Sequence, residues 1–98
     1  MSAFDAAVKH AGAEVIALVR AKNTSYGDSI GRSARMLTLL FPDGIHPDLY
    51  DRLHFIVRML DKLCRLSSLE LSQKAEEDAW SDLAGYALAA LVQSKRRS

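Results

Sequence analysis

Apolar residues follow helical spacing from Leu49 to Cys64, and a stripe of charged side chains runs directly beside them. The charged residues are four, three and four positions apart, so they emerge from one side of a helix. Three potential cations around one carboxylate are typical of a site for an anion or a metal–anion complex, and equally of an ion-pair network at a core boundary. The apolar stripe consists of Leu49, Leu53, Ile56, Val57, Leu60 and Cys64, and the charged stripe of His54, Arg58, Asp61 and Arg65.

Helical periodicity also dominates the rest of the chain, and no segment alternates as a strand would, so the sequence predicts an all-α fold. Helices are expected over residues 3–21, 29–41, 46–67 and 73–93, separated by a polar loop, a Pro42-Asp-Gly44 breaker and a serine-rich connection. Since 98 residues suit one small domain, we expect a compact four-helix domain over residues 1–98, with frayed tails at 1–2 and 94–98. The first helix is expected to bury Phe4, Val8, Ala11, Val15, Ile16, Leu18 and Val19.

The last expected helix is apolar on nearly all sides. A helix of this kind must be covered on nearly all sides, which a chain of 98 residues can hardly do alone. We therefore expect a homo-oligomer, a dimer that forms through this helix, where small residues permit a close approach. The main apolar stripe is Ala79, Leu83, Tyr86, Ala87, Ala90 and Leu91, and the opposite side carries Gly85, Leu88, Ala89 and Val92.

Charge and cysteine content restrict the class of protein. Acidic and basic residues nearly cancel at a net charge of +1, which argues against direct binding to nucleic acid. Cys64 is the only cysteine, so there is no intrachain disulfide, and we expect it to be a small buried hydrophobic residue. The chain has no signal-peptide pattern and no run of about 20 apolar residues, so we expect a cytoplasmic protein without a membrane segment.

Two carboxylates, Asp78 and Asp82, lie four residues apart near the start of the last helix. Like charges at this spacing repel, so the pair indicates a compensating cation, which is either a basic side chain from a neighbouring helix or a divalent metal. Proteins usually hold Mg²⁺ with one or two carboxylates and phosphate oxygens. Glu77 is a weaker ligand candidate, because it points more than about 100° away from Asp82 around the helix. The alternative is that both aspartates are simply solvated near a helix N-terminus.

The segment from Lys22 to Asp28 combines a lysine, several hydrogen-bonding side chains, a tyrosine ring and a glycine. Such a loop can bind a phosphate with lysine and backbone N–H groups while Tyr26 stacks on a base or sugar. It is equally compatible with a plain helix–helix connector whose tyrosine covers the core.

Together, three motifs resemble a phage and bacterial family known as the nucleotide modification associated domain 1 family. The motifs are Lys22-Asn-x-x-Tyr-Gly27, Arg58-x-x-Asp-Lys-x-x-Arg65 and Glu77-Asp-x-x-x-Asp-Leu-Ala-Gly-Tyr86. The resemblance covers residues 22–91, and the family is similar to the MazG-like all-α NTP pyrophosphatases. Those enzymes bind Mg²⁺ with acidic residues on packed helices and cleave a nucleoside triphosphate to monophosphate and pyrophosphate.

The resemblance implies roles for matching residues. The metal-binding and catalytic candidates are Asp61, Asp78 and Asp82, with Glu77 as a further metal candidate, and the cofactor would be Mg²⁺ or Mn²⁺ in its place. The substrate-binding candidates are Lys22, Asn23, Tyr26, Arg58, Lys62 and Arg65. The implied function is metal-dependent pyrophosphohydrolysis or binding of a (d)NTP in phage nucleotide metabolism, in the host cytoplasm.

Two departures from the family pattern keep other functions open. Relatives usually carry Asp where this chain has Ser25, and the third helix has only Asp61 in place of a Glu-x-x-Glu pair. A non-catalytic nucleotide-binding module on the same fold is therefore one alternative. A small phage helical protein that inhibits or escorts a host protein, with purely structural charges, is the other.

Overall fold

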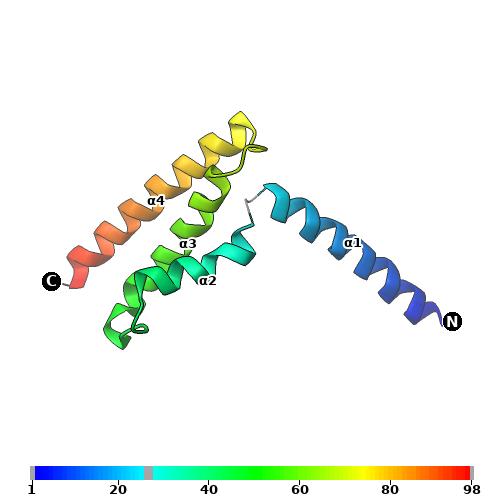
Figure 1. Ribbon diagram of the computed structural model, residues 1–98, viewed down its shortest axis with the longest axis horizontal. Coiled ribbons are helices and arrows are strands. Elements are labelled where there is room, and N and C mark those ends of the chain that lie inside the picture. Colours follow the sequence, from blue (N-terminus) through cyan, green and yellow to red (C-terminus); the bar gives the residue numbers. More distant parts are fainter. Residues whose placement is uncertain (1, 26–27, 98) are drawn as a thin grey trace.

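Four α-helices account for most of the computed structural model, which describes residues 2–25 and 28–97 (Figure 1). A 3₁₀ helix, η1 (Pro47–Leu49), leads directly into α3, and the described residues contain no strand. The predicted all-α fold with four helices is therefore confirmed. The α-helices are α1 (Ala3–Ser25), α2 (Ser29–Leu40), α3 (Tyr50–Leu66) and α4 (Gln73–Arg97).

The core lies around α3, which packs against both α2 and α4. Leu60 and Cys64 of α3 and Ala79 of α4 are its buried apolar residues among the described ones. Cys64 is only 1% exposed, so the prediction of a small buried hydrophobic residue is confirmed. Because Ala79 is small, the backbone of α4 can approach α3 closely.

Helix α1 extends away from the other three helices (Figure 1). It gives the molecule a long dimension of 60 Å against 34 and 26 Å for the other two. Every residue from Ala3 to Lys22 is exposed. The predicted burial of the α1 apolar residues is therefore wrong for a single chain. Periodicity identified the apolar face correctly, but no helix of the same chain lies along that face.

The α1–α2 connection is shorter than predicted. Residues 22–25, expected in a loop, form the last turn of α1, where the Thr24 hydroxyl donates to the Arg20 carbonyl at 3.1 Å. Asp28 then caps α2: its carboxylate accepts from the Gly31 N–H at 3.2 Å, with φ 54° and ψ 48°. Tyr26 and Gly27 lie outside the described residues.

Two further contacts lie at the end of the α3–α4 pair where α3 begins and α4 ends. His46 Nδ1 accepts from the Asp48 N–H at 3.1 Å at the start of η1. Helix α4 continues to Arg97, four residues past the predicted end at Gln93, and Arg97 reaches back to Asp51 of α3 at 3.3 Å. None of the helices in the described part of the chain is long and apolar enough to cross a membrane.

Candidate functional site at the α3–α4 contact

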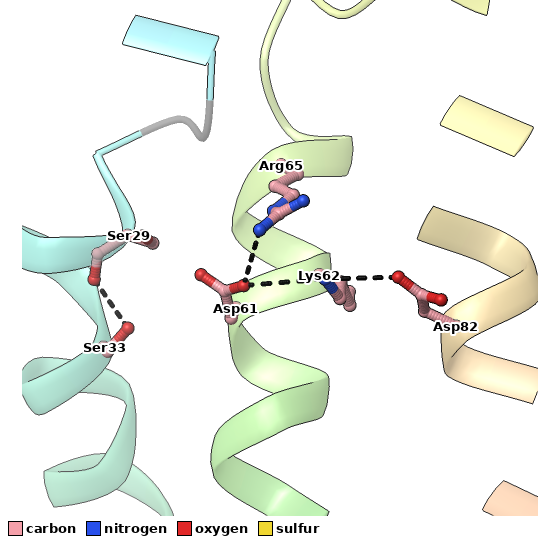
Figure 2. Close-up of polar contacts among 6 residues, drawn as sticks. All are labelled: Ser29, Ser33, Asp61, Lys62, Arg65 and Asp82. Atoms are coloured by element: carbon pink, nitrogen blue, oxygen red, sulfur yellow. Dashed lines mark hydrogen bonds and ion pairs between the residues drawn. The ribbon is translucent and has the colours of Figure 1, made fainter. Parts of the chain in front are cut away.

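Lys62 is the centre of a charged cluster between α3 and α4. Its Nζ lies 3.2 Å from Oδ2 of Asp82 on α4 and 3.9 Å from Oδ2 of Asp61 on its own helix (Figure 2). The lysine residue is 8% exposed, which is rare for lysine unless it is paired. A buried ammonium therefore links two of the carboxylates predicted from the sequence.

Asp61 has a second basic neighbour in the same cluster. The guanidinium Nη2 of Arg65, one helical turn further along α3, lies 3.3 Å from Oδ2 of Asp61. The Asp61 and Asp82 side chains keep 35% and 48% of their surface exposed, so both carboxylates can be reached from solvent. The cluster thus has a buried cation and accessible acidic and basic groups around it.

The expectation that Asp82 has a compensating cation is confirmed, and that cation is a lysine of the neighbouring helix. The other acidic candidates lie elsewhere. Asp78 pairs with Lys74 one turn earlier on α4 at 3.7 Å, and both side chains are largely exposed. Glu77 accepts from the Gln73 side-chain amide at 3.2 Å. The Lys74–Asp78 pair was missed from the sequence, although its spacing of four residues on a helix could have revealed it.

The charged stripe of α3 divides into two parts. Asp61 and Arg65 belong to the cluster around Lys62, whereas Arg58 turns back on its own helix. Its Nη1 donates to the His54 carbonyl at 3.0 Å and lies 3.2 Å from His54 Nδ1. His54 and Arg58 are exposed and line a depression with Tyr50, Leu53 and Val57. Arg58 is therefore not brought into the charged cluster.

The candidates from the first motif lie at the C-terminal end of α1. Lys22 is exposed, and Asn23 is half-buried in an open depression of about 640 Å³ between α1 and the start of α2. The Asn23 side-chain carbonyl oxygen is buried and has no hydrogen-bond partner among the described residues. The Asn23 backbone carbonyl accepts from the Asp28 N–H at 3.1 Å. Asn23 and Lys22 thus lie on a different element from the cluster around Lys62.

Helix α2 supports the cluster from the other side of α3. Arg32 Nη1 donates to the Ser67 hydroxyl at 2.8 Å, and that hydroxyl donates to the Cys64 carbonyl at 2.6 Å. Ser33 donates to the Ser29 carbonyl at 2.6 Å on the inner side of α2 (Figure 2). The Arg32–Ser67 bond ties α2 to the end of α3 that carries Asp61 and Arg65, and the other two bonds are local to each helix.

Cys64 lies inside this framework and is not a reactive group. Burial raises the pKa of its thiol, the charges of Asp61 and Asp28 raise that pKa further, and Arg32 opposes the shift. A thiol with a raised pKa carries little thiolate at neutral pH, and thiolate is the nucleophilic form. Cys64 therefore acts as a packing residue of the core.

The described residues contain no group of three or more His, Cys, Asp or Glu side chains arranged to hold a metal ion. Asp61 and Asp82 are the two predicted acidic ligands that share a neighbour, and that neighbour is an ammonium group. Two carboxylates are what Mg²⁺ uses when phosphate oxygens and water complete its shell. At this contact both carboxylates are paired with basic side chains, Asp82 with Lys62 and Asp61 with Lys62 and Arg65.

Comparison of the chain with protein-family models, with curated proteins and with solved structures finds no match.

Proposed function

We propose that this protein binds the triphosphate of a (d)NTP at the cluster of Asp61, Lys62, Arg65 and Asp82, and acts as a nucleoside triphosphate pyrophosphohydrolase. One observation carries the proposal: a buried lysine brings together carboxylates from two helices, with an arginine beside them. A site with both acidic and basic side chains suits a ligand that also carries both signs of charge, namely a polyphosphate with a divalent cation.

The basic groups supply the phosphate contacts in this proposal. Lys62 and Arg65 donate N–H groups to phosphate oxygens, and planar guanidinium groups such as that of Arg65 bind phosphate in a bidentate fashion. Arg58, Lys22, Asn23 and Tyr26 are proposed as further substrate contacts.

The cofactor is proposed to be Mg²⁺, with Mn²⁺ as a substitute. Asp61 and Asp82 would hold it, and Asp78 and Glu77 remain candidates for the same role. The chemistry that such an ion supplies is neutralisation of phosphate charge and activation of water. Because Lys62 and Arg65 together already balance Asp61 and Asp82, we expect the nucleotide and the metal to bind together, and the metal alone to bind weakly.

The biological setting that we propose follows from the resemblance to the nucleotide modification associated domain 1 family. We place the protein in phage nucleotide metabolism in the host cytoplasm, as a homodimer through α4. The structure's pairing of both carboxylates with one lysine supports a specific alternative, a nucleotide-binding module without hydrolysis. The exposed apolar face of α1 supports a second, a helical protein that binds a host protein.

Turnover and binding distinguish these functions. Each (d)NTP is incubated with the full chain and Mg²⁺ or Mn²⁺, and monophosphate and pyrophosphate are separated by ion-exchange chromatography. We expect product from at least one nucleotide, and its loss in Asp82→Asn and Asp61→Asn. Asp43→Asn, in the exposed turn before η1, is the matched control and should keep full activity.

A thermal-shift series on the same proteins completes the test, because a ligand that binds the folded state raises the melting temperature. A shift without product would identify the non-catalytic module. No product and no shift with any nucleotide, with or without metal, would exclude both nucleotide functions and leave the protein-binding one.

A further inference from the structure

Helices α1 and α4 each carry an exposed apolar stripe on the side that no other helix of the chain covers. The α1 stripe contains Phe4 at 75% and Val15 at 58% exposure, and the α4 stripe contains Trp80 at 55% and Leu91 at 53%. Side chains of this size are normally buried, so both stripes call for a partner surface. The α1 stripe is Phe4, Val8, Ala11, Val15 and Leu18, and the α4 stripe is Trp80, Ala84, Ala87 and Leu91.

The two stripes have matching geometry. Residues of the α1 stripe are spaced four, three, four and three apart, and those of the α4 stripe four, three and four apart. This alternation gives the narrow seam that two helices use when they pack lengthwise with interlocking side chains. The helices are also of similar length, 23 and 25 residues. Large residues at the ends of the α4 stripe and alanines in its middle suit a close approach to Val8, Ala11 and Val15.

The charges at the helix ends are complementary in one relative direction. The C-terminal end of α1 is basic, with Arg20 and Lys22, and the start of α4 is acidic, with Glu76 and Glu77. At the other ends, Asp5 of α1 would meet the basic last turn of α4. Antiparallel packing therefore pairs opposite charges at both ends and also opposes the two helix dipoles favourably.

Helix α1 does not lie on the α4 stripe of its own chain but extends away from α2, α3 and α4 (Figure 1). Helix α1 joins the molecule at the start of α2, whereas α4 lies against α3, and its exposed stripe points away from that contact.

We propose that α1 of one chain packs antiparallel on the α4 stripe of a second copy, and that the second chain returns the same contact. This arrangement deepens the dimer proposed above by naming what covers α4, and it does not depend on nucleotide binding. The two-fold dimer covers both stripes of both chains, whereas pairing of two α1 helices would leave the α4 stripes bare.

The first test is the mass in solution of the full chain, measured by light scattering after size exclusion. Wild type is expected at twice the chain mass, Val15→Asp at the monomer mass, and Ala13→Asp at the dimer mass. Ala13 lies on the opposite face of α1, so Ala13→Asp is a control that introduces the same charged side chain away from the proposed contact. Monomeric wild type would overturn the proposal together with the dimer. A dimer that survives Val15→Asp would overturn the α1 contact alone.

The second test identifies the helices in contact without weakening them. In Val8→Cys/Ala87→Cys, the new thiols lie at the same level of the antiparallel pair, while native Cys64 is buried. Mild oxidation is expected to give a covalent dimer with a disulfide between the α1 and α4 peptides, shown by mass spectrometry. Covalent dimers are expected to be scarce in each single variant. A monomer with an internal disulfide, or a dimer cross-linked equally well by Val8→Cys alone, would overturn the proposal.

Discussion

Lys62 shows how a single residue can link two elements. Its ammonium group lies between Asp61 and Asp82, and Lys62 is the only buried charged residue among the described ones. A buried charge is costly unless paired, and here each partner remains partly hydrated. The pairing therefore limits the desolvation cost of the lysine while it holds α4 against α3.

Replacement of Lys62 should weaken the fold by a measurable amount. Lys62→Met keeps most of the apolar stem and removes the charge, so we expect the free energy of unfolding to fall by about 1–2 kcal/mol, since both carboxylates can still turn to water. Urea denaturation followed by circular dichroism measures the change. Lys74→Met removes the exposed partner of Asp78 and should cost less than about 0.5 kcal/mol. Equal losses in the two variants would contradict the role of Lys62.

The Cys64 thiol should react slowly with thiol reagents in the folded protein. The free energy of unfolding should also fall at alkaline pH because of this thiol. Its pKa is raised in the folded protein, so the unfolded chain loses this proton at lower pH. The stabilisation that the folded protein gains from a neutral thiol is thus fully present below the unfolded pKa of about 8.5, and it is lost as the pH rises through the folded pKa. Ellman's reagent at pH 8 should react slowly with native protein and quickly in urea. Rapid reaction with the native protein would contradict the buried position.

At the scale of the elements, the start of α2 depends on an unusual cap. Asp28 has a left-handed backbone, which a non-glycine residue adopts at some cost, and its carboxylate caps the Gly31 N–H. A Cβ at position 31 would collide with that carboxylate as it is placed here, so a larger residue there would require the Asp28 side chain to shift.

Loss of this cap should destabilise α2 selectively. Asp28→Ala removes the acceptor and keeps the left-handed backbone, so we expect a loss of about 1–2 kcal/mol. Asp28→Asn retains an acceptor and tolerates that backbone, so it should change stability by less than about 0.5 kcal/mol. Thermal unfolding of the two variants beside wild type compares them directly. A larger loss for asparagine than for alanine would show that the cap is not what stabilises this helix start.

The extent of sequence prediction also becomes clear at this scale. The spacing of Leu60 and Cys64 identified the inner face of α3, because the residues that cover it lie nearby in the same chain. The same reasoning failed for Val15, because periodicity gives the apolar side of a helix but not the element that packs on it. The need for a cation near Asp82 was predictable from Asp78, whereas its identity depended on how α3 and α4 cross.

At the scale of the whole molecule, α1 is a projecting arm on a body formed by α2, α3 and α4 (Figure 1). The body has its own buried residues, whereas α1 has an exposed apolar stripe that a second copy is proposed to cover. An isolated helix of this length is marginal in water, so α1 should be stable mainly when it is packed.

Limited proteolysis should therefore depend on protein concentration. With trypsin at a fixed ratio to protein, cleavage after Arg20 and Lys22 should become faster on dilution, as dimers dissociate. Cleavage after Lys62 and Arg65, in the body, should stay slow throughout, because Lys62 is buried and pairs with Asp82 of α4 and Arg65 is half-buried and pairs with Asp61 within α3. Mass spectrometry of early fragments gives both rates. Rates after Arg20 and Lys22 that are independent of concentration would contradict a packed arm.

The shared pairing at Lys62 has a consequence for how this chain can change during evolution. A mutation that removes the lysine leaves Asp82 without its partner from α3 and Asp61 with Arg65 alone, and one that removes either acid leaves the ammonium with one of its two partners. Positions 61, 62 and 82 are therefore expected to be inherited as a set, and successful replacements at one of them should be accompanied by replacements at another.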